Sequence, residues 1–345
     1  MLNLKTTSGL LVLTLAGMTS QAAAPSLSYE VNGNELIINY TGTLLQSTDA
    51  VHWTEVAFAS SPCKVKISDK KLFFCAKGET SKNMTIPLSD TVSLDMIRIE
   101  PGTVMMGSPE DELGRQDDEV QHQVTLTQGY WLGKYEVTQA QYEAVMGKNP
   151  SCYKGADLPV EQVSWNDAVK FCEWLTAQER AAGRLPEGYE YTLPTEAQWE
   201  YACRAGTTTA FNNGTNIPTM LQRTDRPCPN LDPLAWYGYN SGEYNSAGNY
   251  TGNGKTFPVG QKQPNAWGLY DMHGNVWEWC LDWYGSYPSS AVTDPKGPAT
   301  GSDRVIRGGS WVSYACYCRS ASRSSGDPDR YNYFGGFRVA LAPVQ

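Results

Sequence analysis

Residues 268–279 read Gly-Leu-Tyr-Asp-Met-His-Gly-Asn-Val-Trp-Glu-Trp, a stretch that mixes turn-forming residues with large aromatic ones. The same mixture extends over residues 207–345, where glycine, proline, asparagine and aromatic residues dominate and helix signals are missing. Short strand-like runs interrupt it, for example at 304–307 and 337–341. We therefore expect the C-terminal part of the chain to consist of loops and short strands.

Upstream of this part, three helices are expected from their start signals. Each start is a capping box, in which a Ser or Thr is followed three residues later by a Gln or Asp. The three boxes begin at Thr138, Ser164 and Thr195. Residues 96–108 read as strand, turn and strand. Together these signals predict one α+β domain over residues 93–345.

The N-terminal residues carry the marks of a secretion signal. Lys5 precedes a short apolar run at 10–18, and Ser20-Gln-Ala22 offers a cleavage site of small residues. We expect residues 1–24 to be removed as a signal peptide and the protein to be exported, to a periplasm, the medium or the cell surface. The rest of the chain holds no apolar run long enough to span a membrane.

Residues 25–92 predict a small all-β module. Alternating strands at 27–31 and 35–40 are joined by a hairpin turn at Asn32-Gly-Asn34. A Cys63–Cys75 disulfide would stabilise a module of this size, which buries little apolar surface. We find nothing catalytic in it.

Charge and cysteine content exclude several functions. The formal net charge is −9 and no basic stripe is present, which argues against nucleic-acid binding. Nine cysteines, an odd number, leave at least one thiol without an intramolecular partner. No CxxC pair, GxSxG, HExxH or phosphate-binding glycine loop is present.

Seven strings, in order, resemble the signature of the formylglycine-generating-enzyme (sulfatase-modifying factor) family. This family has a variant of the C-type-lectin fold, so the resemblance implies that fold, preceded here by the β module. The strings occupy residues 102–108, 135–139, 159–165, 193–201, 268–279, 307–311 and 336–338.

The resemblance implies one possible activity, a copper-dependent oxidase that converts a sulfatase cysteine to formylglycine. Such enzymes bind copper through two thiolates, which suit a soft Cu(I) ion. Here Ser313 stands where the first active-site cysteine is expected. A C-x-C clamp in an extended strand would be the substitute, because alternate residues of a strand share a face. If the protein is an enzyme, its site residues are Ser310, Trp277, Cys316 and Cys318.

The resemblance also implies a structural calcium site and a disulfide. Asp271 and Glu278 would supply carboxylates to Ca²⁺, and Gly274 and Val276 would supply carbonyl oxygens. The alternative is that Glu278 pairs with an arginine. The implied disulfide joins Cys203 to Cys318, a pairing that would leave Cys316 alone.

Residues 311–338 resemble the variable region of proteins diversified by retroelements, which use the same lectin-like fold. In this segment one set of residues, which we call the frame, alternates with intervening positions, which we call the slots. The slots are mostly asparagine in many family members. Here nearly every slot residue can be reached from an AAC codon by changing adenines alone. The frame residues are Trp311, Ala315, 318–321, Arg323, Pro328, Arg330 and 336–338.

We expect the slots to face solvent and bind a ligand, because tyrosine and serine are typical of recognition surfaces. The partner would be an extracellular protein or glycan. A display protein of this kind is our first interpretation, and the copper oxidase is the alternative. The expected ligand-binding residues are Val312, Ser313, Tyr314, Cys316, Tyr317, Ser322, Ser324, Tyr331, Asn332, Tyr333 and Phe334.

Overall fold

The computed structural model divides the chain into two compact units, Met1–Lys82 and Asn83–Gln345. It describes residues 83–218, 227–243, 249 and 251–344 of the second unit. In the first unit it describes the backbones of eight short strands and few side chains. In the part of the chain so described, no helix combines the length and the apolar character needed to cross a membrane.

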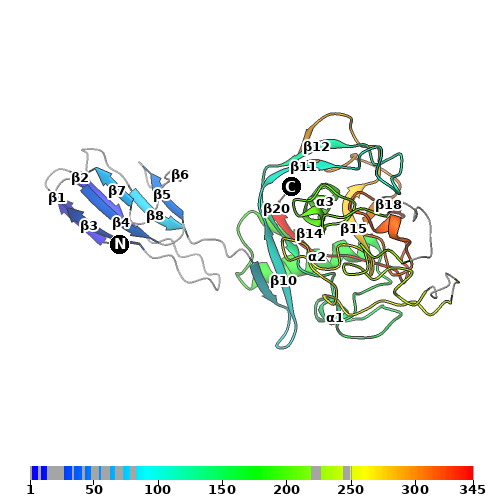
Figure 1. The fold of residues 1–345 in the computed structure, drawn as a ribbon. Coiled ribbons are helices and arrows are strands. Elements are labelled where there is room, and N and C mark those ends of the chain that lie inside the picture. The colour runs from blue at the N-terminus through cyan, green and yellow to red at the C-terminus, as the bar shows by residue number, and fades with distance from the viewer. Residues whose placement is uncertain are drawn as a thin grey trace. The chain divides into compact units, whose positions relative to one another are not determined.

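The first unit contains two small sheets, with strand orders β3-β4-β7 and β1-β2-β8-β5-β6 (Figure 1). The expected hairpin is present, because β3 and β4 pair antiparallel up to Asn32 and Glu35. Strands β1 and β2 lie inside the segment expected as a signal peptide, so export stays a prediction. The side chains of Cys63 and Cys75 lie outside the described residues, and so does their disulfide. The strands are β1 (Leu2–Thr6), β2 (Gly9–Leu13), β3 (Leu27–Asn32), β4 (Glu35–Tyr40), β5 (Thr43–Ser47), β6 (Thr54–Glu55), β7 (Cys63–Lys66) and β8 (Phe73–Lys77).

A five-stranded sheet of order β14-β20-β13-β10-β9 organises the second unit. Its last element, β20, pairs with both β13 and β14, which places the C-terminus inside the sheet. The unit begins at Asn83 and not at residue 93, because β9 pairs with β10 over five residues. The strands are β9 (Asn83–Pro87), β10 (Ser93–Ile99), β13 (Tyr130–Gly133), β14 (Tyr189–Thr192) and β20 (Ala340–Pro343).

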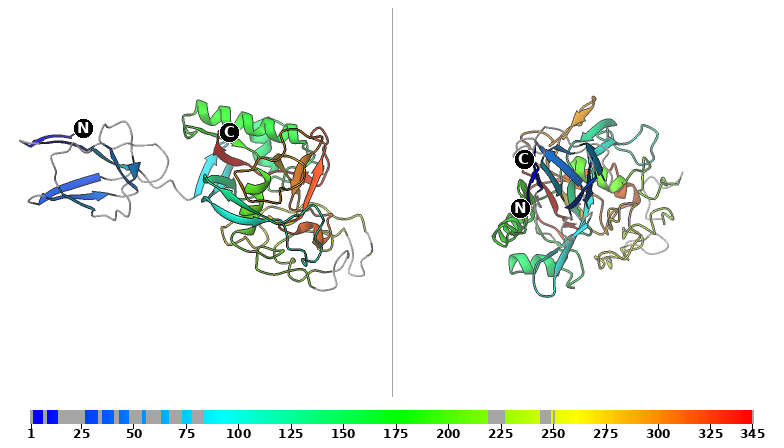
Figure 2. Two further views of the ribbon diagram at one scale, coloured as in Figure 1. Left: turned by 90° about the horizontal axis from the view of Figure 1, so that it is seen from above. Right: turned by 90° about the vertical axis from the view of Figure 1, so that its left-hand side faces the viewer.

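The three expected helices are confirmed, each with its capping box formed. They are α1 (Gln139–Met146), α2 (Trp165–Ala181) and α3 (Glu196–Arg204). Figure 2 shows the long α2 running along the outside of this unit. Its buried face, from Ala168 to Leu175, packs into the same apolar core as α1 and the five-stranded sheet.

Two smaller sheets carry the region of functional interest. One has the order β11-β12-β16 and the other β18-β17-β15-β19. Between α3 and β15, the described residues of 205–276 form neither helix nor strand, as the sequence predicts. The unit is therefore α+β and rich in loops. The strands are β11 (Gly102–Met106), β12 (His122–Leu126), β15 (Trp277–Trp283), β16 (Val292–Thr293), β17 (Arg304–Arg307), β18 (Arg323–Gly326) and β19 (Gly335–Gly336).

Candidate functional site

Buried arginines hold the segment 311–338 against the rest of the second unit. Arg319 donates to Glu119 and Glu112, and its side chain is fully buried. Arg323 binds both carboxylate oxygens of Glu196, at 2.9 and 2.7 Å. Bidentate arginine–carboxylate pairs are strong and require a specific geometry. These frame residues therefore fix the backbone of the segment, as the sequence predicts.

The electrostatics of these pairs agree with ionised partners. Burial raises the pKa of Glu196, but the charges of Arg323 and Arg307 outweigh it and leave the pKa below its usual value. Burial also raises the pKa of Glu119, and the hydrogen bond and charge of Arg319 reverse that effect. Removing one partner of such a buried pair typically costs about 3–5 kcal/mol, since it leaves an uncompensated charge.

The loop between β18 and β19, residues 327–334, is the exposed part of the segment; we call it the tyrosine loop. Tyr331 is 65% exposed and Tyr333 is 45% exposed. The Tyr333 ring packs against Trp311, with 5.8 Å between ring centroids, and Tyr153 meets the same tryptophan edge-on at 5.6 Å. Tyr153 lies outside the segment and was not expected from the sequence. Tyr333 thus has a rigid aromatic support and keeps much of its surface open.

Backbone hydrogen bonds fasten the tyrosine loop at its base. Gln162 N donates to Asn332 O at 2.9 Å, and Trp277 N donates to Phe334 O at 2.8 Å. The Asn332 side chain accepts from Phe334 N at 3.1 Å. Asn166, in the first turn of α2, donates to Asp329 at 2.6 Å. The loop is therefore ordered by contacts that do not use its tyrosine side chains.

Three residues expected on the binding surface are instead inside the protein. Ser313, Cys316 and Ser322 are 7%, 3% and 0% exposed. The reason is the local fold: residues 313–322 pass under the surface through a short 3-10 helix, η1 (Ala315–Cys318), before entering β18. The remaining expected residues that are not fully exposed are half-buried: Val312, Tyr314, Tyr317, Ser324, Asn332 and Phe334.

The extended strand assumed for a C-x-C copper clamp is not present at Cys316 and Cys318. Cys316 and Cys318 lie in η1, where residues two apart point in different directions, and not in a strand. Burial raises the pKa of the Cys318 thiol well above its usual value, which disfavours the thiolate that Cu(I) requires. Ser310 contacts the hydroxyl of Ser313 at 3.1 Å instead of a second sulfur. Among the described residues, no three His, Cys, Asp or Glu side chains are arranged to hold a metal ion.

The expected Cys203–Cys318 disulfide is also absent, since both residues are free thiols. The Cys203 sulfur is directed toward Ser320 Oγ, at 3.6 Å, and Met272 O, at 3.8 Å. Cys318 belongs to a different apolar cluster, together with Cys228 and Phe211. The two sulfurs thus face different parts of the interior.

The residues expected to bind calcium do not fit that role in this arrangement. Glu278 accepts from Arg338 through both oxygens, at 2.6 Å each, and from Trp199 at 2.7 Å. This is the arginine-paired alternative. Asp271 keeps one buried oxygen without a hydrogen bond, while Gly260 N donates to the other at 2.7 Å. A calcium ion at Glu278 would have to displace Arg338, so calcium binding stays a prediction that this geometry does not favour.

Positive-φ backbone explains why the 268–279 stretch adopts its shape. Asp271, Gly274 and Asn275 have φ values of 56°, 80° and 59°, in the left-handed region that glycine and asparagine tolerate best. The Asn275 side chain donates to Glu136 at 2.6 Å and accepts from Phe257 N at 3.0 Å. Gly274 N donates to Gly308 O, which joins the stretch to the end of β17, just before the segment 311–338.

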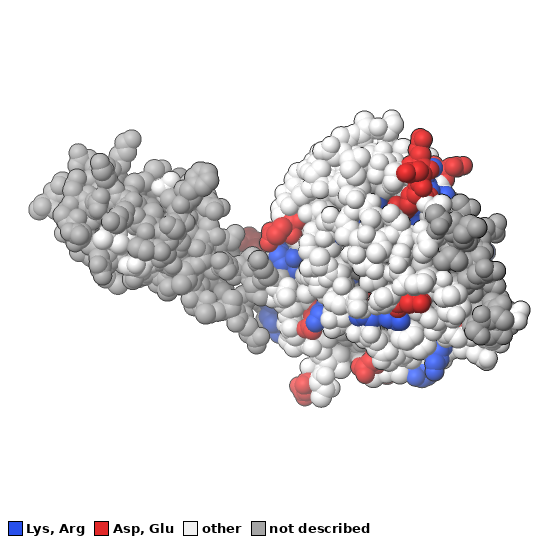
Figure 3. Space-filling model, in the orientation of Figure 1, with Lys and Arg blue, Asp and Glu red and all other residues white. Residues whose placement is uncertain are grey.

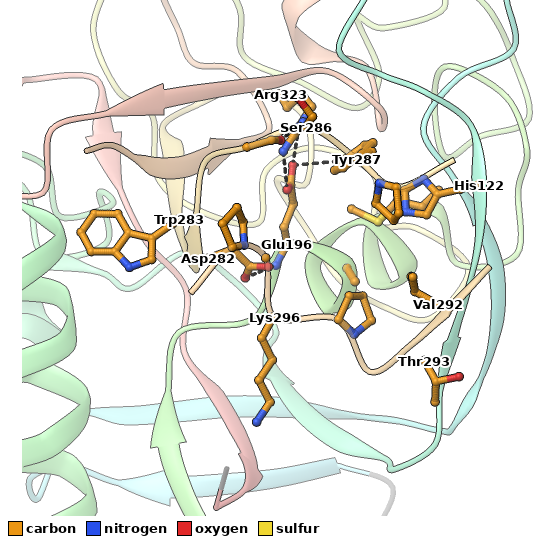
Figure 4. A pocket seen from close by; sticks show the side chains of 17 residues that line it. His122, Glu196, Asp282, Trp283, Ser286, Tyr287, Val292, Thr293, Lys296 and Arg323 are labelled. Atoms are coloured by element: carbon orange, nitrogen blue, oxygen red, sulfur yellow. Dashed lines mark hydrogen bonds and ion pairs between the residues drawn. The ribbon is translucent and has the colours of Figure 1, made fainter. Parts of the chain in front are cut away.

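A cavity of about 530 Å³ lies between α3, the start of β18 and the loop that follows β15 (Figure 4). Its charged and polar lining includes Glu196, Asp282, Arg323, His122 and Lys296. Sequence reasoning missed this cavity. The available signal was Asp282, an acidic residue set within the apolar run of β15.

Charged side chains are otherwise sparse on the face of the second unit seen in Figure 3, and no continuous basic stripe crosses its described residues. This face gives no support for nucleic-acid binding.

Comparison with known proteins identifies the scaffold. The family described as sulfatase-modifying factor enzyme 1-like domain matches residues 87–343. The formylglycine-generating enzyme of Mus musculus is 37% identical over 224 residues, which cover 64% of this chain and 53% of that enzyme. The chain thus spans about half the length of this relative. A chaperone protein, LppX, from Paenibacillus barcinonensis is 34% identical over 223 residues, 55% of this chain and 71% of that protein.

Among solved structures, Treponema denticola variable protein 1 has a TM-score of 0.63 and 32% identity. The match covers 76% of this chain and all of that protein. PvdO from Pseudomonas aeruginosa has a TM-score of 0.58 at 26% identity, over 75% of this chain and 97% of that one.

Proposed function

The chain belongs to the sulfatase-modifying factor enzyme 1-like family, and we propose that it uses this scaffold to bind a ligand and not to catalyse a reaction. The ligand would be an extracellular protein or glycan, met by the tyrosine loop of an exported protein. Diversification of residues 311–338 by a retroelement is part of the proposal. The likeness to a variable protein of Treponema denticola supports it.

One observation carries the proposal: Tyr331 and Tyr333 are exposed on a loop whose backbone is held at its base by residues outside the segment 311–338. Tyrosine offers a large contact area for the loss of few rotatable bonds, so exposed tyrosines on a rigid base are suited to binding. Replacing these side chains leaves the arginine pairs untouched. The surface can therefore vary while the scaffold stays folded.

The second candidate is the copper oxidase, which the similarity to formylglycine-generating enzymes supports. Against it stand Ser313 in place of a cysteine, and the burial of Cys316 and Cys318 in a 3-10 helix instead of an open strand. Oxygen-dependent conversion of a sulfatase-motif peptide by the copper-loaded protein would establish the oxidase and overturn the binding proposal.

The gene itself provides a direct test of diversification. We expect a near-copy of the codons for 311–338, differing only at adenines, beside a reverse-transcriptase gene. Sequencing the locus in related strains should then show changes at Tyr331 and Tyr333 and not at Arg319 or Arg323. A locus without such a copy, with changes spread evenly over frame and slots, would refute diversification.

Binding is tested on arrays of glycans and extracellular proteins. A variant with Tyr331→Ser and Tyr333→Ser should lose the signals that the wild type gives. Trp174→Ser is the matched control, because Trp174 is an aromatic residue 44% exposed on α2. Equal signals from all three proteins would refute a role for the tyrosine loop.

A further inference from the structure

The cavity beside α3 shares no residue with the tyrosine loop, and the proposed function does not use it. Its lining is largely apolar and includes three prolines, Val292, Met106 and Ala197. Enclosed apolar walls that surround a few polar groups are the usual form of a small-molecule site.

Two of the charged groups in the cavity are already satisfied. Both oxygens of Glu196 accept hydrogen bonds, from Arg323 and from Tyr287, as the dashed lines of Figure 4 show. The remaining nitrogen of Arg323 donates to Gly285 O at 2.9 Å. The hydrogen-bonding groups of Glu196 and Arg323 are therefore already used, and this pair offers a ligand neither a net charge nor a free guanidinium edge.

Asp282 is different, because only half of its carboxylate is used. Its Oδ2 accepts from Glu196 N at 2.8 Å, while Oδ1 accepts no hydrogen bond from another residue in the part of the chain that the structure describes. The residue is 4% exposed. The charges of Arg323 and Arg304 act on Asp282 without forming an ion pair with it among the described residues, and Lys296 extends away from it in Figure 4. Asp282 lies between Trp279 and Trp283, where the pairing of β15 with β17 is irregular. Such an irregularity can redirect a side chain away from its position in a regular ladder.

A buried carboxylate oxygen that accepts a hydrogen bond from no other described residue, on the wall of a mostly apolar cavity, selects a particular ligand. Burial, and then the neighbouring Glu196, raise the pKa of Asp282 to about 7, so an added positive charge would relieve an electrostatic cost. A guanidinium group would need two acceptor oxygens side by side, and one is occupied. A divalent metal would need several oxygen ligands, which the described residues do not assemble. An ammonium group is compact, and its alkyl chain would fit between the prolines.

We propose that this cavity binds a primary ammonium group, carried by a small alkylamine or a lysine side chain, with Asp282 Oδ1 as its acceptor. The apolar wall would hold the alkyl chain, and the open side of the cavity would admit it.

Calorimetry with n-butylamine at pH 8 tests the proposal on the full chain. We expect binding that Asp282→Asn weakens by about 10-fold or more, the typical effect of losing a charge-assisted hydrogen bond. Asp294→Asn is the matched control: it removes the same charge from the adjacent loop, where Asp294 binds Thr127 and does not line the cavity. It should change the dissociation constant by less than about 2-fold.

Two further measurements keep the test decisive. Ser286 is an exposed residue of the cavity lining, so Ser286→Trp should block binding without unfolding the protein, even if Asp282→Asn fails to fold. N-acetyl-lysine methylamide distinguishes a lysine side chain from a free amine as the source. If n-butanol binds as tightly as n-butylamine, or if Asp294→Asn and Asp282→Asn have equal effects, the proposal is wrong.

Discussion

Replacing Asp282 by Asn should change how the stability of the second unit depends on pH. The carboxyl is buried, and its pKa is raised from 3.8 to about 7. Below the lower value the folded and unfolded states both carry the proton, and the group costs nothing. As the pH rises toward 7, the unfolded chain loses the proton first, so unfolding becomes easier.

The magnitude follows from the difference between the two pKa values. Each pH unit corresponds to about 1.4 kcal/mol, so the wild type should lose about 4 kcal/mol of unfolding free energy relative to Asp282→Asn between pH 4 and pH 8. Little solvent screening is expected, since the side chain is only 4% exposed. Asparagine keeps an oxygen that can accept from Glu196 N, so the start of α3 is preserved.

Urea unfolding of both proteins at several pH values measures this effect. Other buried carboxyls, such as Glu136, titrate in both proteins and cancel in the difference between them. Parallel curves, with a difference that stays constant within about 1 kcal/mol, would show that the carboxyl does not carry this cost. A wild type that gains stability relative to the variant as the pH rises would reverse the sign and refute the reasoning outright.

Three other predictions follow from the same structure. Glu278→Gln should lower the unfolding free energy by about 3 kcal/mol, because it leaves the buried guanidinium of Arg338 unpaired. EDTA should shift the melting temperature of the wild type by less than about 1 °C, since no bound calcium would be removed. A large EDTA effect would support the calcium site. Iodoacetamide should modify exposed Cys152 in the native protein but Cys203 only after unfolding, as peptide mass spectrometry would show, because burial raises the pKa of the Cys203 thiol to about 12; a Cys203 that stays unmodified in unfolded, unreduced protein would be in a disulfide. Urea unfolding should find Tyr331→Ser within about 0.5 kcal/mol of the wild type and Ser322→Tyr destabilised by about 2 kcal/mol or more, since a ring would overpack the interior; equal effects would mean that both positions lie at the surface.

The features that the sequence predicted correctly are local or carried by ordered motifs. A capping box such as Thr138 to Gln141 needs only a few neighbouring residues, so it could be read directly and is formed. The family match at 87–343 agrees with strings that specify turns and buried contacts along the whole second unit. The start of that unit was misplaced because the pairing of β9 with β10 depends on register, which a short alternating run does not reveal.

The errors at the candidate site concern contacts between distant residues. Ser313 and Ser322 were expected at the surface as slots of the 311–338 pattern, but their burial is set by the path of the chain around η1. The C-x-C argument assumed an extended strand, but the two cysteines lie in a 3-10 helix, where residues two apart do not share a face. The cavity could not be predicted, because Asp282, Glu196 and Arg323 meet from three elements far apart in the sequence.

The burial pattern also limits where a diversified surface could lie on this scaffold. Arg319, Arg323 and Arg338 reach carboxylates that belong to the loop before β12, to α3 and to β15. Each pair joins the segment 311–338 to a part of the domain outside that segment, and its loss would cost several kcal/mol of a marginal stability. A slot lying between these anchors and inside the protein, such as Ser322, cannot accept an arbitrary side chain. Tyr331 and Tyr333 can be replaced more freely, because they are exposed and the contacts that fasten the tyrosine loop do not use their side chains. Variation at buried slots should therefore be restricted to small residues, even if the genetic mechanism changes every slot alike.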